Sequence, residues 1–461
     1  MENSRGHVVV LTYSAQGHIN PLLQFAKCLA SKGLKATFAT TPYTAKFITA
    51  KGVQVMPISD GFDDGGFRDA PNVADYLESF KTVGSRTLTE LILKLNQTSD
   101  SPVNCLVYDS LLLWAVDVAK KLDIFSVVLL TNSASVCSLY WQIHRGFLPF
   151  PVEKDKVPLT IPGLPPLGLD ELPSFLAFPS HNSAYLESIM RIFARLDEND
   201  WVFANSFEDL ENELAKVLTG LWPVQMVGPM VPSAYVEGPI AGDSDYGGSL
   251  WKPSDHYLKW LEEKAPKSVV FVSFGSMADV EIKQIEEIAC GLKGSSHHFL
   301  WVIKDSEQEK FLAEFLQSND EMGFGKIVKW CNQLEVLAHK SVGCFMTHCG
   351  WNSTLEAVSL GVPMVALPQW SDQPTNAKFI ESVWRVGVRA KRDDKMIVTR
   401  EEIERCVREV MVGEKSDEIR INASKMREQA KRAVCNDGSS DIAINNFVEV
   451  LIKGKGTKLN Q

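Results

Sequence analysis

WCNQLEVLAHKSVGCFMTHCGWNSTLEAVSLGVPMVALPQWSDQ, residues 330–373, is the stretch of this 461-residue chain that decides its fold. Two short apolar runs in it, Val342–Thr347 and Met364–Ala366, flank a segment with helical spacing, Ser353–Leu360. Strands separated by helices predict a parallel, doubly wound sheet. The polar turn His348–Ser353 joins the first run to the helix, and its glycine lets the backbone approach a ligand closely.

The side chains along this stretch suit a nucleotide diphosphate. Trp330 follows a short predicted strand, Lys326–Lys329, where its indole offers a flat wall for an aromatic base. The helix after the turn aims free N–H groups and partial positive charge at that turn, which suits a diphosphate. Polar residues of Trp370–Gln373 then stand at the carboxyl end of the next predicted strand.

Each part of the stretch also has a purely structural interpretation. Ser353 and Glu356 have the spacing of a capping box, in which the glutamate only ties down its own helix. Trp330 and Trp351 are compatible with core aromatics, and His348 with a hydrogen-bonded core histidine. The order of all the parts within one stretch is what favours a binding site.

The alternation of strands and helices extends over both halves of the chain, which is too long for one hydrophobic core. In the first half a helix is predicted over Pro21–Ser31, with Asn20 as its cap. Residues 231–254 are rich in Gly, Pro, Ser and Asp and lack periodicity, as in a linker. We predict an α/β protein with two Rossmann-like domains that face a deep cleft, over 1–235 and 255–440, with a linker over 236–254 and a C-terminal helix within 441–461.

The array from Trp330 to Gln373 resembles the signature of the plant family 1 UDP-glycosyltransferases, whose two Rossmann-like domains have the arrangement called GT-B. The resemblance covers essentially the whole chain, and it implies that the C-terminal helix crosses back onto the N-terminal domain. It also implies a donor site for UDP-sugar. The residues implied are Trp330 and the Cys331 backbone for uracil, Gln333 and Glu356 for ribose, His348, Asn352, Ser353 and Ser276 for the diphosphate, and Trp351, Asp372 and Gln373 for the sugar.

One position of the array bears on the sugar and another departs from the family. In this family Gln at the place of Gln373 goes with glucose donors and His with galactose donors, so UDP-glucose is the expected co-substrate. Asn332 stands where the family often has Pro, and we expect a looser turn after Trp330.

A second polar cluster lies near the N-terminus. His18 follows the first predicted strand and Asp109 ends the strand Val103–Tyr108, so both emerge from carboxyl ends of strands in one sheet. In a His–Asp pair the carboxylate fixes the imidazole tautomer and stabilises the imidazolium. The alternative is that both side chains only cap or pack. The resemblance includes this loop and favours the pair as catalytic base, and it implies a contact of Thr131 with the sugar.

The resemblance implies a single displacement that inverts the anomeric carbon, without metal and without a cofactor. Asp243 and Asp245 match the DxD pattern by which other glycosyltransferases hold a divalent cation. They lie in the predicted linker, away from any strand end, so we interpret them as a loop feature.

The acceptor is the part on which the sequence is least specific. The resemblance places the acceptor pocket in the N-terminal domain and is closest to the branch acting on aromatic acids, phenols, terpenoids and steroids. We expect a small hydrophobic acceptor, and both ester and ether glucosides stay open. The candidate lining residues are Tyr13, Leu112, Met277 and Trp370.

Three other functions compete with this one. One is the same fold with another donor, such as UDP-xylose or UDP-rhamnose. Gln373 and Trp351 argue against such a donor. A dinucleotide-dependent oxidoreductase would need a GxGxxG turn after an early strand, and Ser14–His18 lacks that spacing. A non-catalytic binding protein on the same fold is opposed by the presence of His18, Asp109 and the donor array.

Composition narrows the class of protein. The net charge of −10, with both signs interspersed, predicts neither nucleic-acid nor membrane-surface binding. Nine scattered cysteines without CxxC spacing predict reduced thiols, and the early apolar run is too short for a signal sequence or a membrane span. We expect a cytoplasmic protein, a monomer without macromolecular partners.

Overall fold

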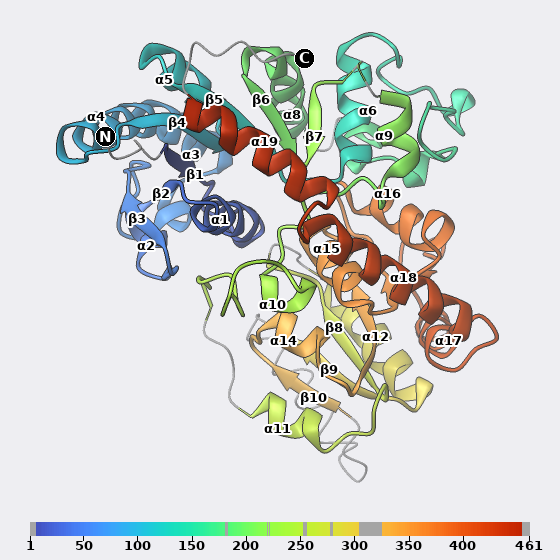
Figure 1. Cartoon of the computed structure of the whole chain (residues 1–461). Helices are drawn as coiled ribbons and strands as arrows, with labels where there is room; N and C mark the ends of the chain where they lie inside the picture. The colour runs from blue at the N-terminus through green and yellow to red at the C-terminus, as the bar shows by residue number, and fades with distance from the viewer. Residues whose placement is uncertain are drawn as a thin grey trace.

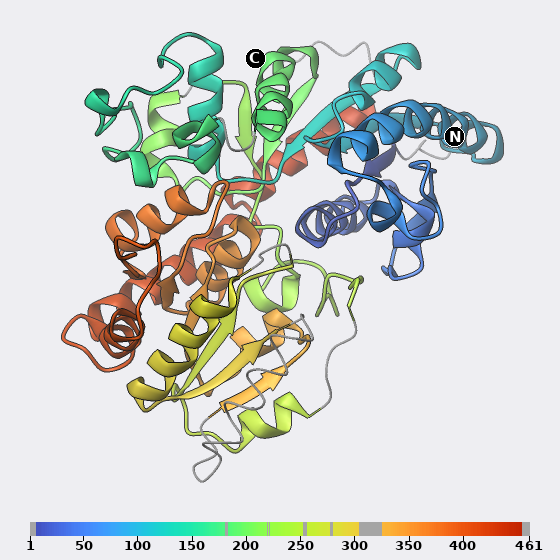
Figure 2. The same cartoon turned by 180° about the vertical axis from the view of Figure 1, so that it is seen from behind.

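The computed structural model describes residues 6–179, 183–218, 220, 222–251, 256–276, 280–303 and 325–453 of the chain. They form two parallel β-sheets, each in its own lobe of the molecule (Figures 1 and 2). The first sheet has the strand order β3-β2-β1-β4-β5-β6-β7, and the second has the order β10-β9-β8-β11-β12-β13. The predicted fold class, two Rossmann-like domains, is confirmed.

The strands of the first sheet are β1 His7–Leu11, β2 Lys35–Thr40, β3 Val53–Pro57, β4 Val103–Asp109, β5 Phe125–Leu130, β6 Trp201–Ala204 and β7 Val224–Met226. Those of the second are β8 Val269–Ser273, β9 His298–Val302, β10 Gly325–Val328, β11 Val342–Thr347, β12 Met364–Ala366 and β13 Gly387–Arg389. The strands expected over Val103–Tyr108, Lys326–Lys329, Val342–Thr347 and Met364–Ala366 correspond to β4, β10, β11 and β12. Sequence patterns missed β3, β7 and β13, which are outer strands of the two sheets.

Helices connect the strands. In the first domain these are α1 Gln16–Ser31, α2 Pro42–Ala45, α3 Val73–Ser79, α4 Ser85–Thr98, α5 Ala115–Lys121, α6 Ala134–His144, α7 Ser174–Ala177, α8 Ser183–Ala194 and α9 Asn212–Leu218. Further along the chain are α10 Ser233–Val236, α11 Tyr257–Glu262, α12 Ile282–Ser295, α14 Gln333–Leu337, α15 Trp351–Leu360, α16 Gln373–Lys378, α17 Arg400–Met411, α18 Ser416–Val434 and α19 Ser439–Lys453.

Burial on both faces explains the continuous apolar strands. In β1, Val8 and Val10 pack on one face with apolar residues of α1 and α19, and Val9 and Leu11 pack on the other with residues of α3 and α4. All five residues of β1 are buried. A strand with helices on both faces has no polar side, so its sequence does not alternate.

The order of the strands within each sheet determines where a crevice for ligands opens. In the first sheet β1 and β4 are neighbours, and in the second β8 and β11 are neighbours, although each pair is separated in the sequence by other strands. At such a switch point the connections leave in opposite directions and open a crevice beyond the carboxyl ends of the strands. His18 and Asp109 flank the first switch point, and Ser276 and His348 flank the second.

The helix after β1 starts earlier than predicted. α1 begins at Gln16, so Asn20 lies inside the helix and does not cap it. Pro21 is therefore internal and has no N–H to bond the carbonyl of Gly17 one turn earlier. That carbonyl accepts a hydrogen bond from Nδ2 of Asn352 in the other domain at 2.6 Å, which makes the internal proline tolerable.

The capping box predicted for α15 is also absent. The helix begins at Trp351 with Gly350 before it, so Ser353 is already in the first turn and caps nothing. The side chains of Ser353 and Glu356 are engaged with Gln333 instead. Both side chains are thus directed to the cleft.

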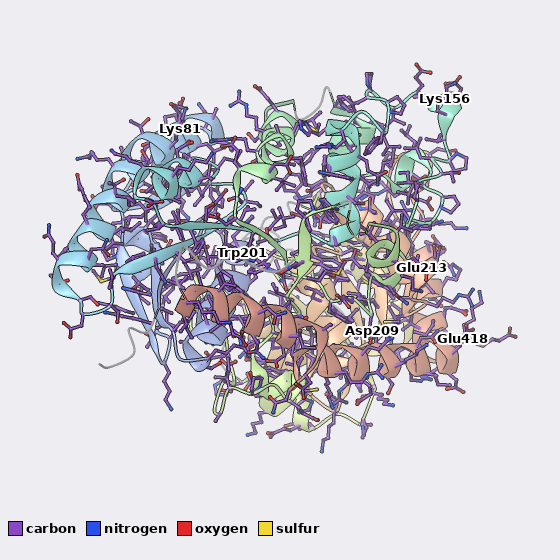
Figure 3. The ribbon with its side chains drawn as sticks, turned by 45° about the horizontal axis from the view of Figure 1, so that its top comes forward. Lys81, Lys156, Trp201, Asp209, Glu213 and Glu418 are labelled. Atoms are coloured by element: carbon purple, nitrogen blue, oxygen red, sulfur yellow. The ribbon has the colours of Figure 1, made fainter. Side chains whose placement is uncertain are left out.

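The last helix joins the domains. α18 lies on the second domain, and α19 runs from it along the first (Figures 1 and 3). There Phe447 packs edge-on against Trp201, which Figure 3 labels beside α19, and against Phe203. The ion pair between Lys32 and Asp441 adds a polar contact at 2.5 Å.

Among the helices that the structure describes, none combines the length and the apolar character needed to cross a lipid bilayer.

Candidate active site

A cavity of about 740 Å³ opens between the carboxyl ends of the two sheets and has walls from both domains. The sequence-predicted residues that line it are Tyr13, His18, Thr131, Ser276, Trp330, Cys331, Gln333, His348, Trp351, Asn352, Ser353, Glu356, Trp370, Asp372 and Gln373. The size suits a nucleotide-sugar together with a second small molecule.

His18 and Asp109 form a pair at the floor of this cavity. Nδ1 of His18 lies 2.7 Å from Oδ2 of Asp109, which is fully buried behind the ring. The other oxygen of Asp109 accepts the backbone N–H of Leu111 at 2.9 Å, and this bond fixes the orientation of the carboxylate. With Nδ1 bonded to the carboxylate, Nε2 is the nitrogen of His18 left to exchange a proton with a ligand.

Charge around the imidazole favours its protonated form. Burial lowers the pKa of His18, but the charge and hydrogen bond of Asp109 and the charge of Asp372 outweigh that effect, so the pKa stands above its usual value. Thr131 lies beside the pair, with its hydroxyl 3.4 Å from Nδ1. A histidine with these neighbours is suited to accept a proton and to remain as an imidazolium.

Two glycines make room for His348 at the second switch point. A Cβ on Gly275 would lie 2.7 Å from Cε1 and Nε2 of His348, and a Cβ on Gly350 would lie 2.5 Å from Nε2. Gly275 also has φ +75°, a conformation that disfavours other residues. The imidazole is therefore held between two backbone turns, next to the N-terminus of α15, where partial positive charge gathers.

Gln333 organises the residues assigned to the ribose. Its Nε2 donates to the Ser353 hydroxyl at 2.9 Å and to Oε2 of Glu356 at 2.7 Å. Burial raises the pKa of Glu356 to about 7, while hydrogen bonds from Gln333 and Tyr246 lower it. The indole of Trp330 stands nearby with its N–H bonded to the Ser249 hydroxyl at 3.2 Å.

Asp372 and Gln373 present a hydrogen-bond acceptor and a hydrogen-bond donor, respectively. The side-chain oxygen of Gln373 accepts the backbone N–H groups of Gln369 and Trp370 at 2.8 and 3.1 Å, which assigns the amide NH₂ to the donor role. Asp372 is held by Nδ2 of Asn376 at 2.8 Å, and burial raises its pKa to about 6. An acceptor and a donor side by side match neighbouring hydroxyls of a sugar.

Trp351 lines the cavity, and its indole ring is held from the first domain. Its indole N–H donates to the carbonyl of Asn205 in the other domain at 2.7 Å, and the ring packs near Trp384. The indole N–H is therefore already engaged, and the expected contact of Trp351 with a sugar stays a prediction.

The predicted acceptor residues divide into three cases. Tyr13 and Trp370 line the cavity, whereas Leu112 is buried in the core of the first domain, so its prediction is wrong. Leu111 takes that place, because the turn closed by Asp109 directs Leu111 outward. Met277 lies outside the described residues.

Aromatic residues of α6, α7 and α8 form one wall of the cavity, on the side of the expected acceptor pocket. Phe175 stacks on Tyr185 at 5.8 Å, and Trp370 stands edge-on to both, at 5.8 Å from Phe175 and 6.0 Å from Tyr185. The α7 segment is docked on the second domain by the Lys378–Glu171 ion pair at 2.9 Å. The wall is thus built from both domains. No Lys or Arg occurs among the described residues that line the cavity.

The chain is similar to known proteins over most of its length. The family model described as UDP-glucoronosyl and UDP-glucosyl transferase matches residues 79–431. The chain belongs to this family. UDP-glycosyltransferase 74B1 of Arabidopsis thaliana is 47% identical, over 97% of this chain and 98% of the relative. The flavonol 7-O-beta-glucosyltransferase UGT74F1 of the same plant is 42% identical, over 97% and 99%. The crystal structure of Os79 from O. sativa with UDP aligns with a TM-score of 0.91 and 39% identity, covering 96% of this chain and 99% of Os79.

Two unusual features of the sequence, Asn332 and Asp243, have structural roles in this glycosyltransferase. Asn332 caps α14 by accepting the N–H of Glu335 at 3.4 Å, and its own N–H, which a proline would lack, donates to the Tyr257 hydroxyl. The predicted loosening of this turn is therefore wrong. Asp243 is buried and accepts Lys27 Nζ at 2.6 Å, and its other oxygen accepts Nε2 of Gln24 at 2.7 Å. The described part of the glycosyltransferase contains no group of three or more His, Cys, Asp or Glu side chains placed to hold a metal.

Sequence reasoning missed two elements of the glycosyltransferase site. Asn132, which follows β5, hydrogen bonds Asp372 and lowers its pKa. Residues 245–249 of the linker line the donor side, where Tyr246 donates to Glu356. Position after a strand end was a usable signal for Asn132, whereas no local pattern marks the linker residues.

Proposed function

We propose that this glycosyltransferase moves glucose from UDP-glucose to a hydroxyl of a small hydrophobic acceptor, with inversion at the anomeric carbon. The observation that carries the proposal is the His18–Asp109 pair, bonded at 2.7 Å, at the floor of a cavity shared by both domains. The pair lies between the polar wall of the second domain and the aromatic wall of α6–α8.

The reaction is a single displacement. Nε2 of His18 takes the proton of the acceptor hydroxyl while the acceptor oxygen bonds to the anomeric carbon. The bond from that carbon to the diphosphate oxygen breaks on the opposite face, and UDP leaves with the bonding electrons. An α-linked donor then gives a β-glucoside. Asp109 stabilises the imidazolium that forms and holds its tautomer.

In this proposal the residues of the second domain stabilise the leaving diphosphate electrostatically. Negative charge grows on the diphosphate as it leaves, and His348 together with the N-terminus of α15 stands where this charge would develop. The family resemblance assigns Asn352, Ser353 and Ser276 to the same group. In this proposal the charge is offset by protein groups, and UDP-glucose is a co-substrate with no further cofactor.

Glucose is supported by the donor geometry at Gln373. Its NH₂ and the Asp372 carboxylate provide one donor and one acceptor to adjacent hydroxyls. In the family Gln at this position accompanies glucose. UDP-xylose and UDP-rhamnose are the competing donors.

The acceptor wall favours an uncharged acceptor. The lining residues contributed by α6, α7 and α8 are mostly aromatic or aliphatic, and the described lining has no Lys or Arg to pair with an acid. A carboxylate is already ionised and needs no base, whereas a hydroxyl needs the His18–Asp109 pair. We therefore favour ether glucosides of phenols, terpenoids or steroids over esters.

All nine cysteines have free thiols, and most of them are buried. Such thiols persist in a reducing compartment, which supports the cytoplasm as the place of action.

The test is mass spectrometry of the purified enzyme with UDP-glucose and a panel of phenols, triterpenes, steroids and aromatic acids. Each aromatic acid is paired with the alcohol of the same skeleton. We expect a gain of one hexose on an alcohol or phenol. His18→Gln should lower turnover about 10²- to 10⁴-fold, the usual contribution of a general base. His339→Gln, outside the cavity lining, is the control.

Three outcomes count against parts of the proposal. Transfer from UDP-xylose or UDP-rhamnose in preference to UDP-glucose would refute glucose as the donor sugar. Products confined to the aromatic acids would refute the hydroxyl class. Tight binding of UDP-glucose without any product from the whole panel would favour a binding protein on this fold.

A further inference from the structure

The linker between the domains forms part of the donor wall, and its contacts tie both domains together. On the side of the first domain, Asp243 is bonded to Lys27, Gln16 bonds the linker backbone at Gly248 and Leu250, and the N–H of Thr49 donates to the carbonyl of Gly247. On the side of the second domain, Ser249 accepts the Trp330 indole N–H. The linker position is therefore fixed from two directions.

Tyr246 stands in the middle of this fixed segment. Its hydroxyl donates to Oε1 of Glu356 at 2.9 Å, and Gln333 donates to Oε2 at 2.7 Å. Each carboxylate oxygen therefore has one protein donor, and each keeps a further lone pair for a ligand hydroxyl. All three residues line the cavity.

We infer that Tyr246 is a positioning residue for the carboxylate that binds the ribose of the donor. The inference rests on the proposed donor site. Tyr246 acts through Glu356: its hydrogen bond sets the plane of the carboxylate and keeps the carboxylate in the charged form that accepts ribose hydroxyls. Because the segment is anchored on α1, nucleotide affinity depends on the seating of the linker against the first domain.

The surroundings of Glu356 explain why it needs this donor. Burial raises its pKa to about 7, and the hydrogen bonds of Gln333 and Tyr246 oppose that rise. Tyr235 of α10 and Cys331 lie near it, and their pKa values are raised by burial and, to a smaller extent, by the charge of Glu356, so both are neutral neighbours. No ion pair to Glu356 occurs among the described residues. Hydrogen bonds are therefore its main means of staying ionised.

The experiment is calorimetric titration of the full-length enzyme with UDP between pH 5.5 and 8.5. The wild type should bind UDP more weakly as Glu356 becomes protonated on the acidic side. In Tyr246→Phe the loss of one hydrogen bond should move that midpoint to higher pH. At pH 7 the UDP affinity should fall about two- to tenfold, the range of a single lost hydrogen bond.

Two comparisons separate positioning from a general effect on the fold. Tyr108→Phe removes another buried hydroxyl that donates a hydrogen bond, to Asn199 at 2.7 Å, outside the cavity lining, and should leave the UDP profile unchanged. In a Glu356→Gln background, which has no group to titrate, Tyr246→Phe should have little further effect. Melting temperatures of all variants verify that each is folded.

The outcomes are distinguishable. An unchanged affinity and midpoint in Tyr246→Phe would overturn the inference, as would losses that add fully in the double variant. Failure of the wild type to bind UDP at any pH would instead overturn the proposed donor site itself.

Discussion

Adding one methyl group at Gly275 should impose the two costs that this position avoids, backbone strain and a clash with His348. A Cβ there would meet two atoms of His348 at 2.7 Å, and the residue has φ +75°. The variant Gly275→Ala therefore strains the backbone and displaces the imidazole of His348. Two other glycines each carry one of these costs. Gly33 has φ +91° with nothing within 4 Å of its Cβ, whereas Gly350 lacks a positive φ but would place a Cβ 2.5 Å from Nε2 of His348.

The magnitudes follow from these geometries. A left-handed conformation costs a non-glycine residue about 1–2 kcal/mol, so Gly33→Ala should lower stability by that amount and leave donor affinity unchanged. Loss of a hydrogen bond from His348 to a charged phosphate corresponds to about 1.5–3 kcal/mol, or about a 10- to 150-fold weaker affinity for UDP. Gly350→Ala should show mainly the affinity loss, and Gly275→Ala should show both effects.

Urea unfolding measures the stability term and calorimetric titration with UDP measures the affinity term. UDP affinity in Gly275→Ala equal to that of the wild type would refute the assignment of His348 to the diphosphate. A similar affinity loss in Gly33→Ala would show that strain far from the site accounts for the effect.

Three further changes test the base, the linker anchor and the sugar contact. Asp109→Asn should lower kcat and move the rise of kcat/KM with pH to lower pH, because the charge of Asp109 raises the pKa of His18, and His18 acts only when unprotonated. Lys27→Met should lower the free energy of unfolding by about 3–5 kcal/mol in urea titrations, since it leaves the buried carboxylate of Asp243 without its cation. Gln373→Glu keeps the oxygen that accepts two backbone N–H groups but removes the NH₂, so the KM for UDP-glucose should rise about tenfold, the effect of a lost hydrogen bond of about 1.4 kcal/mol.

Each of these three predictions has an outcome that would contradict it. A kcat/KM profile unmoved by Asp109→Asn would exclude Asp109 from tuning the base. Lys120→Met breaks an exposed ion pair with Glu198 and should cost about 1 kcal/mol or less, so equal losses would show that burial is not the cause in Lys27→Met. For Gln373→Glu the affinity for UDP itself should not change, and a parallel loss would point to the nucleotide and not the sugar.

That most candidate donor residues line one cavity was predictable, because they follow one another in a single stretch. From Trp330 to Gln373, short strands and their connections bring the side chains to one sheet edge, so order in the sequence translates directly into place in the cavity. The meeting of His18 and Asp109 was predictable for a related reason, since both lie at the carboxyl ends of strands that are neighbours in the sheet.

The features that were missed depend on contacts that the local sequence pattern does not show. Pro21 has the local signature of a helix start, and its internal position in α1 is compensated by Asn352 from the other domain. The choice between Leu111 and Leu112 depends on one backbone bond to Asp109. Tyr246 lies in a stretch without periodicity, and only the folded structure brings it to Glu356.

These contacts also connect the proposed donor site with the proposed base. Asn352, which the family resemblance assigns to the diphosphate, donates to the carbonyl of Gly17, the residue before the proposed base. Trp351, its neighbour on α15, donates to Asn205 of the first domain. A donor that orients α15 therefore acts on the same helix that holds the first domain against the second. In the proposed reaction we therefore expect the seating of α15 on the donor to influence the position of His18, which lies next to one of these contacts.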